Sequence, residues 1–215
     1  MQNLTIIFLT ANKVPKEWAK YHKEVLLEAI GDSPVITISF EPMDFGKNLI
    51  QTEYSITNVY RQIHRGACEA TTPYIAIVED DTLYPKEHFE YRPALDKYAY
   101  NMNRWCITDK RRPSNSFYYL VHKPANSNLI APRELLVKDL EERFRKDPDF
   151  LRVTSIKEVG RDDFISFYTN TPVVGFKHHF SVDDLERRGR KREGPICAYN
   201  LPGWGSSSDV MSKWK

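Results

Sequence analysis

Residues 73–85, PYIAIVEDDTLYP, join an apolar run directly to three acids. Residues 74–78 suit a strand that is buried on both faces, and Glu79, Asp80 and Asp81 follow it without a spacer. Carboxylates held this close together repel one another, so such a cluster is usually stabilised by a cation. Oxygen ligands suit Mg²⁺ or Mn²⁺, and the segment therefore predicts a divalent-metal site at the end of a strand. A solvated acidic turn, continued by residues 82–85, is the competing interpretation.

The first half of the chain alternates between strand and helix patterns. Residues 4–10 form an apolar, β-branched run, a helical pattern follows from Pro15, and residues 34–40 predict a second strand. After a loop at 41–54, a second amphipathic helix is expected from Ser55, and it leads into the strand that precedes the acids. This order is typical of parallel βαβ units.

The second half shows short strand patterns with polar turns between them. They are expected at 105–108, 117–121, 128–131 and 171–176. Pro132 opens a third helical pattern. Strands this short and closely spaced are typical of mixed or antiparallel pairing. The residues from 181 onward are charged and predict a partly irregular tail.

Two polar segments follow predicted strands of the first half. Thr10, Ala11 and Asn12 come after the first strand, and the three acids come after the third. In open α/β sheets, ligands bind outside the carboxyl ends of the strands. We therefore expect both segments to face one cleft.

Two further pairs of residues are candidates for chemistry. Asp162 and Asp163 could supply a general base for an acceptor hydroxyl, or could cap a helix. His178 and His179 could supply an imidazole ligand to a metal, or could be structural. Because neighbouring side chains on a strand point to opposite faces, at most one of the two histidines is expected in the cleft.

Basic residues offer partners for phosphate. Arg61 and Arg65 lie on the second predicted helix, where they either hold phosphate or form a solvated face. Residues 187–192 hold five Lys or Arg side chains. This basic run could close over a diphosphate or contact an anionic acceptor, and a solvated tail is the alternative.

Composition narrows the class of protein. The formal charge of +2 is too close to neutral to imply a nucleic-acid partner by itself. The three cysteines are far apart and form neither a metal-binding spacing nor a disulfide framework, which favours a reducing compartment. No apolar run approaches the roughly 18 residues of a membrane span, and the N-terminal run lacks the features of a signal peptide. We expect a cytoplasmic protein.

Five segments, taken in order, resemble a known enzyme family. They are LTAN at 9–12, NVYRQIHRGACEA at 58–70, YIAIVEDD at 74–81, GRDDF at 160–164 and VVGFKHHFS at 173–181. The chain is similar to the GT-A fold glycosyltransferases, particularly the family 2-like group. The resemblance implies an α/β fold with a Rossmann-like nucleotide-binding sheet, helices on both faces and a mixed sheet in the acceptor half. It also implies a single domain at 1–181, divided into a nucleotide-sugar half at 1–85 and an acceptor half at 86–181. A basic tail at 182–215 would follow.

The resemblance also implies roles for the acids and the histidines. Glu79 and Asp81 look like the outer members of the family's DXD motif. Asp81 would be the direct ligand of Mn²⁺ or Mg²⁺, and Asp80 would approach the ribose or the sugar. One of His178 and His179 resembles the late metal ligand of the family.

Roles for the remaining candidates follow from the same resemblance. Asp163 aligns with the catalytic base of inverting members, and Asp162 takes the place usually held by Glu. The donor-binding positions would be Thr10, Ala11, Asn12, Arg61 and Arg65, together with Asp80.

The expected activity is metal-dependent transfer of a sugar from a nucleoside-diphosphate sugar to an acceptor hydroxyl. Inversion by direct displacement is the expected course, with retention left open. A nucleotidyltransferase and a degenerate GT-A domain that binds without catalysis are the alternatives. The acceptor could be a saccharide, a lipid-linked molecule, a protein or a modified DNA base, the last through the basic run and the tryptophans beyond it.

Overall fold

The computed structural model describes residues 3–108, 116–148, 159–160, 162–178 and 196–214. Its largest sheet has seven strands in the order β10-β6-β9-β4-β1-β2-β3. Their bounds are β1 Leu4–Leu9, β2 Val35–Ser39, β3 Lys47–Ile50, β4 Tyr74–Glu79, β6 Tyr98–Asn101, β9 Leu129–Pro132 and β10 Phe164–Phe167. The four strands from the first half, β1 to β4, are all parallel. β9 runs antiparallel to both β4 and β6, and β10 runs parallel to β6.

A second sheet of five strands has the order β12-β8-β7-β11-β5. Its strands are β5 Thr82–Leu83, β7 Arg104–Thr108, β8 Tyr118–Leu120, β11 Val173–Lys177 and β12 Cys197–Ala198. β11 runs parallel to β7, whereas the other pairs in this sheet are antiparallel. The predicted mixture of pairing in the second half is therefore confirmed.

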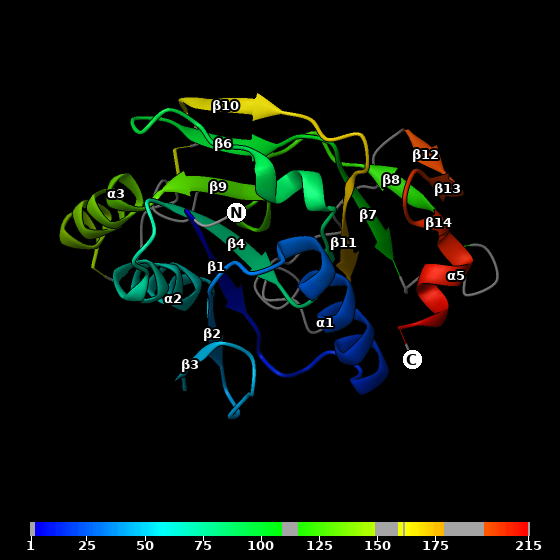
Figure 1. Ribbon diagram of the computed structural model, residues 1–215, viewed down its shortest axis with the longest axis horizontal. Coiled ribbons are helices and arrows are strands. Elements are labelled where there is room, and N and C mark those ends of the chain that lie inside the picture. The colour runs from blue at the N-terminus through cyan, green and yellow to red at the C-terminus, as the bar shows by residue number, and fades with distance from the viewer. Residues whose placement is uncertain (1–2, 109–115, 149–158, 161, 179–195, 215) are drawn as a thin grey trace.

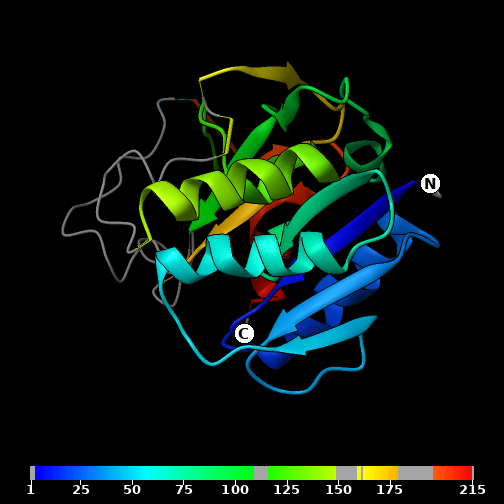
Figure 2. The same cartoon turned by 90° about the vertical axis from the view of Figure 1, so that its left-hand side faces the viewer.

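Helices cover both faces of the larger sheet (Figures 1 and 2). α1 (Lys16–Ile30) and the short 3₁₀ helix η1 (Lys86–Glu90) pack on the face that includes Ile6 and Phe8. α2 (Ile56–Glu69) and α3 (Arg133–Lys146) lie side by side on the opposite face, against Ile7 and Leu9. The alternation of β1 side chains between the two cores follows from the two-residue period of a strand. The predicted α/β class, with helices on both faces, is confirmed.

The C-terminal residues form ordered elements where the sequence predicts a partly irregular tail. β12 pairs with β8, and a hairpin of β13 (Asn200–Leu201) and β14 (Gly205–Ser206) leads into α5 (Ser207–Ser212). Leu201 and Val210 are buried in a third apolar cluster beside α1 and the second sheet. Apolar side chains spread among polar ones therefore attach this segment to the domain. The basic run at 187–192 lies outside the described residues.

Several short elements differ from the sequence-based expectations. The expected loop at 41–54 contains β3, the turn expected at 82–85 begins with β5, and β6 and β10 had no predicted counterpart. A further 3₁₀ turn, η2 (Asn126–Asn128), precedes β9. Strands of two to four residues carry too little periodicity to be recognised, and tertiary pairing decides them. None of the described helices has the length and apolar character needed to cross a membrane.

Candidate functional site

The acidic segment lies at the carboxyl end of β4, beside the end of β1. The amide of Asp80 donates to the Leu9 carbonyl at 3.3 Å, which aligns the two strand ends. Thr10 Oγ1 donates to Asp80 Oδ2 at 2.5 Å and accepts from the Asn12 amide at 2.9 Å. The two polar segments that follow β1 and β4 therefore meet, as the sequence predicts.

The Asp80 carboxyl lies in an environment that disfavours its charge. Desolvation by burial, and next the neighbouring Asp81 carboxylate, raise the pKa of Asp80 to about 7. The hydrogen bond from Thr10 and the charge of His178 act in the opposite direction but do not outweigh burial. A cation placed beside these carboxylates would relieve the repulsion between them.

Asp81 contacts a histidine that lies 97 positions later in the chain. His178 Nε2 lies 3.2 Å from Asp81 Oδ2, and their side chains are only 6% and 17% exposed. The amide of Phe176 donates to the Asp81 carbonyl at 2.7 Å, which holds the end of β11 beside the acids. His178 is therefore the histidine found at the cluster, while His179 lies outside the described residues.

Two side chains of α1 contact backbone carbonyls of the acidic segment and of the residue that follows it. Trp18 Nε1 donates to the Asp80 carbonyl at 2.7 Å, and His22 Nε2 lies 2.8 Å from the Thr82 carbonyl. Burial lowers the pKa of His22 to about 4, so this imidazole is neutral near pH 7 and donates to the carbonyl oxygen. Trp18 lies in the helical pattern expected from Pro15. The sequence gave no signal for the role of His22, because polar contacts to backbone leave no sequence pattern.

A tyrosine and a lysine border the acids on the side of β2. Lys13 Nζ lies 4.1 Å from the centre of the Tyr54 ring, and Phe40 packs 6.0 Å from it. The pKa of Tyr54 is raised by burial and next by the charges of Asp80 and Asp81. The Tyr54 hydroxyl is therefore close enough to these carboxylates to feel their charge. Sequence reasoning missed Tyr54 and Lys13, which both lie in regions expected to be loops.

Asn12 fixes the loop between these groups. Its backbone has a φ of +56°, and its Oδ1 accepts from the amides of Phe40 and Glu41 at 2.9 and 3.1 Å. Asparagine tolerates this left-handed conformation better than most residues. The side-chain oxygen thereby joins the loops that follow β1 and β2.

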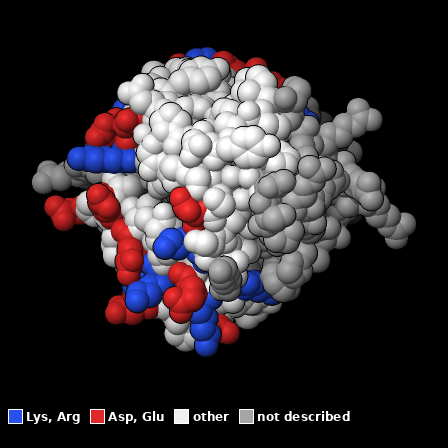
Figure 3. Space-filling view, turned by 90° about the vertical axis from the view of Figure 1, so that its right-hand side faces the viewer, with Lys and Arg blue, Asp and Glu red and all other residues white. Residues whose placement is uncertain are grey.

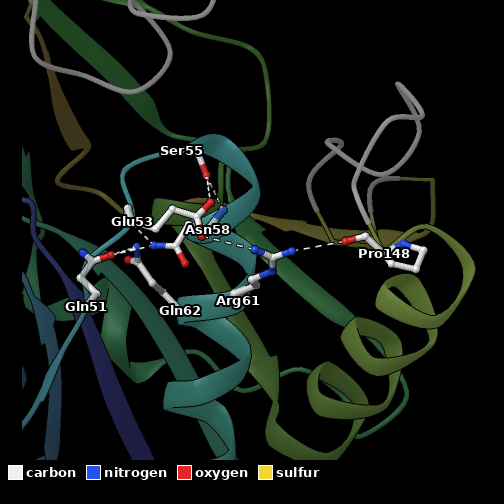
Figure 4. A network of polar contacts seen from close by, with 7 residues as sticks. All are labelled: Gln51, Glu53, Ser55, Asn58, Arg61, Gln62 and Pro148. Carbon is white, nitrogen blue, oxygen red and sulfur yellow. Dashed lines mark hydrogen bonds and ion pairs between the residues drawn. The ribbon is translucent and has the colours of Figure 1, made fainter.

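A buried polar network secures the segment before α2 (Figure 4). Asn58 Nδ2 donates to Gln51 Oε1 at 2.8 Å, and Gln62 Nε2 donates to the same oxygen. Gln51 Nε2 in turn donates to the Thr10 carbonyl at 3.2 Å. The network therefore connects α2 to the Thr10 backbone, and it fixes the loop that carries Tyr54.

The two helix arginines predicted to bind the donor contact the protein itself. Arg61 pairs with Glu53 at 3.3 Å and donates to the Pro148 carbonyl at 3.3 Å (Figure 4). Arg65 donates to the Ile50 carbonyl at 2.7 Å. These contacts tie α2 to the ends of neighbouring loops, and a phosphate-binding role for either arginine stays a prediction.

The structure does not bring Asp162 and Asp163 to the acidic cluster. Strand pairing sets Ile165, Ala99, Ile130 and Ala76 in one row across β10, β6, β9 and β4. Asp163 precedes β10, whereas the cluster follows β4, which runs in the same direction. Five residues along the strands at about 3.3 Å each, and three strand spacings of about 4.8 Å, separate Asp163 from Glu79 by on the order of 20 Å. Asp163 instead pairs with Lys97 at 2.6 Å and is largely exposed. Asp163 therefore lies away from the acidic cluster, and its role as the catalytic base stays a prediction.

The described residues include no preformed metal cluster, and the cavity beside η1 is not lined by the acids at 79–81. Within the described part of the chain, no group of three or more His, Cys, Asp or Glu side chains is arranged to hold a metal ion. A cavity of about 400 Å³ lies between η1 and the residues that follow β10, and none of the acids at 79–81 lines it. The described structure thus brings Asp81 and His178 into contact without a third ligating side chain arranged beside them.

Comparison with known proteins gives low similarity. No family model matches the sequence, and no curated protein matches it. The bifunctional IspDF from Campylobacter jejuni has 9% identity and a TM-score of 0.45, over 78% of this chain and 50% of that chain. A glycosyltransferase involved in glycosylation of the major capsid of PBCV-1 has 10% identity and a TM-score of 0.47, over 80% and 92%. S. aureus TarS 1–349 in complex with UDP-GlcNAc has 10% identity and a TM-score of 0.46, over 83% and 59%.

The chain spans half the length of the first of these structures. At TM-scores below 0.5 the likeness supports no functional assignment, and the family 2-like resemblance stays a prediction. A function has to come from the residues of the site.

Proposed function

We propose that this protein is a metal-dependent glycosyltransferase that takes a sugar from a nucleoside-diphosphate sugar. One observation carries the proposal: Asp81 and His178, 97 positions apart, meet 3.2 Å apart at the carboxyl end of β4. Carboxylate oxygens suit Mn²⁺, and imidazole nitrogen is a ligand of divalent first-row metals in general. Asp80, whose pKa is raised to about 7 by burial and by Asp81, supports a cation at the same place.

In this proposal Asp81 and His178 hold the ion. When bound, the ion would offset the negative charge that develops on the departing diphosphate. The protein's part is to keep the two ligands in place. Trp18 and His22 hold the carbonyls of Asp80 and Thr82, and the Phe176 amide holds the carbonyl of Asp81. Fixed ligands of this kind avoid a reorganisation cost during the reaction.

The donor nucleotide would lie between the loops that follow β1 and β2. Tyr54 offers a ring for stacking, and the ammonium group of Lys13 lies beside it as a partner for phosphate. Thr10 orients the Asp80 carboxyl, which would approach the ribose or the sugar. Direct displacement with inversion remains part of the proposal. Because Asp163 lies away from the acids, the proposal gives the acceptor's proton to another group.

The proposal is tested by thermal shift with a panel of nucleoside diphosphates, each with and without Mn²⁺. A ligand present at 100 times its dissociation constant stabilises the folded state by about 2.7 kcal/mol. We expect a Mn²⁺-dependent shift with one nucleotide, and its loss in Asp81→Asn. The matched control is Asp163→Asn, an exposed acid at the opposite end of the sheet, which should keep the wild-type shift.

Turnover separates an enzyme from a binding module. The nucleotide that gives the shift identifies the sugar donors to assay, and hydrolysis or transfer is then followed in wild type and in Asp81→Asn. Binding without any turnover would indicate a domain that binds but does not catalyse. No shift with any nucleotide would contradict the proposal as a whole.

A further inference from the structure

Trp214, the last described residue, packs against the histidine of the candidate site. Its ring centre lies 5.0 Å from that of His178, with an angle of 43° between the planes. The same indole stacks on Phe176 at 4.7 Å and 13°, and lies 4.9 Å from Trp18. Trp18 and Phe176 are in turn 4.1 Å apart. These three side chains, Trp18, Phe176 and Trp214, form an aromatic cluster behind the site.

The aromatic cluster contacts both halves of the candidate ligand set. Trp18 reaches the acidic segment through its hydrogen bond to the Asp80 carbonyl. Trp214 contacts the His178 ring directly. The relative position of the acids and the imidazole therefore depends on how these aromatic rings pack.

His178 needs such support because of its place in the chain. β11 ends at Lys177, so His178 lies one residue beyond the last strand pairing. Outside the sheet, its ring orientation depends on its side-chain contacts, since χ1 and χ2 are otherwise set only by rotamer preference. Asp81 contacts its Nε2, and Trp214 packs against the ring.

The C-terminal segment is anchored well enough to carry this role. Trp204 Nε1 donates to the Pro172 carbonyl at 2.7 Å, and the buried Ser207 hydroxyl donates to the Ser116 carbonyl. Ser206 Oγ accepts from the Asp209 amide at the start of α5, and the Trp214 amide donates to the Met211 carbonyl at 3.0 Å. Trp214 is thereby placed by a fixed segment.

These contacts also change the interpretation of the C-terminal tryptophans. The sequence raised stacking of Trp204 and Trp214 on nucleic acid, but both indoles make contacts within the domain. On the face that carries the C-terminal elements, Lys and Arg of the described residues mix with Asp and Glu at its border (Figure 3). In the described part of this face they form no basic patch.

We propose that Trp214 is a positioning residue, which holds the His178 imidazole against Asp81 in the orientation needed to bind a metal ion. This inference rests on the proposed function for its consequence in metal binding. The orientation of the ring itself is a separate statement, and it can be measured without any metal.

Two measurements on the full chain test the proposal. The first is carbethoxylation of His178 by diethyl pyrocarbonate, mapped by mass spectrometry with fragmentation that resolves His178 from His179. Trp214→Ala should raise the rate at His178 severalfold, whereas Trp214→Phe, which keeps a stacking ring, should stay near wild type. The second is Mn²⁺ affinity, which we expect to fall about tenfold or more in Trp214→Ala and to be largely rescued in Trp214→Phe.

Trp204→Ala is the matched control. It removes an indole and a hydrogen bond from the same segment, but the contact with His178 is made by Trp214. If Trp204→Ala raises His178 labelling as much as Trp214→Ala does, the role of Trp214 is only to stabilise the segment, and the proposal is overturned. Unchanged labelling in Trp214→Ala also overturns it. If wild type binds no Mn²⁺ while labelling responds as expected, the proposed function fails and the positioning of the ring stands.

Discussion

His178 Nε2 lies 3.2 Å from Asp81 Oδ2 because two short strands bring distant parts of the chain together. β5 begins one residue after Asp81, and it pairs with β11, which ends one residue before His178. Both candidate ligands therefore lie just outside the same pair of strands. Backbone pairing brings the two residues to one place, and the packing of Trp214 then bears on how the His178 ring faces Asp81.

A double-mutant cycle tests whether the two residues share one ion. Asp81→Asn and His178→Gln should each weaken Mn²⁺ binding by about tenfold or more, because each removes one ligand. The double variant should bind Mn²⁺ about as weakly as the weaker-binding single variant. Once one ligand is removed, the site is already broken and removal of the second ligand has little further effect. Titration of Mn²⁺ into each purified protein gives the four affinities. Strictly additive losses would mean that the residues act at separate places.

Asp163→Asn is expected to leave nucleotide and Mn²⁺ binding unchanged. The carboxyl of Asp163 is largely exposed and pairs with Lys97 at the amino end of β10. A surface ion pair of this kind contributes little to stability, so the variant should also fold normally. Thermal shifts with ligand, measured beside Asp81→Asn, provide the comparison. Loss of ligand binding in Asp163→Asn would restore the role that the sequence resemblance implied.

Asp80 and Asp163 show which parts of the site the sequence can predict and which it cannot. The apolar run before Glu79 predicts a buried strand, and the parallel βαβ order then predicts which strand ends lie together. Thr10 and Asp80 meet for that reason. Asp163 was placed by resemblance of a short motif, without a pattern that fixes the strand after it. Because β10 is four residues long and, among the described residues, pairs with β6 alone, its location depends on tertiary pairing that local sequence does not encode.

Trp214 and Tyr54 illustrate a second limit. Each contacts the site from a segment without helical or strand periodicity, and their contacts are set by loops that the buried polar groups Asn58 and Ser207 fix in place. Hydrogen bonds from side chains to distant backbone atoms leave no periodic signal in sequence. Core elements can therefore be predicted from pattern, whereas the supporting contacts of the site cannot.

Gly66 lies where α2 approaches β1 most closely. A Cβ at this position would come within 2.8 Å of Ile7 Cγ2. Alanine improves helix propensity by about 1 kcal/mol, but forcing an extra carbon into a packed core costs about 1–3 kcal/mol. We therefore expect Gly66→Ala to destabilise the protein by about 1 kcal/mol in urea unfolding. In an Ile7→Ala background the same change should become stabilising, because the added methyl then fills space. A stabilising effect in both backgrounds would contradict the close packing of α2 on β1.

His88 should make stability depend on pH. Its side chain is completely buried, its Nε2 has no hydrogen-bond partner among the described residues, and burial lowers its pKa from 6.5 to about 3. Between these two pH values the unfolded chain binds a proton that the folded protein excludes. The contribution of His88 to the free energy of unfolding is therefore fully present above pH 6.5 and is lost as the pH decreases. On lowering the pH from 7.5 to 5, this residue alone should remove about 2 kcal/mol from the free energy of unfolding.

His88→Phe isolates this contribution. Phenylalanine can pack against the rings of Tyr84, Phe89 and Phe167 that surround position 88, and it does not titrate. Urea unfolding at pH 7.5 and pH 5 should show a smaller loss of stability for the variant than for wild type, by about 2 kcal/mol. The control is His122→Gln, in which an exposed histidine is removed and the wild-type loss is expected to persist. If His88→Phe loses as much stability as wild type over this range, the pH dependence comes from other groups, and the buried imidazole is not excluded from protonation in the folded state.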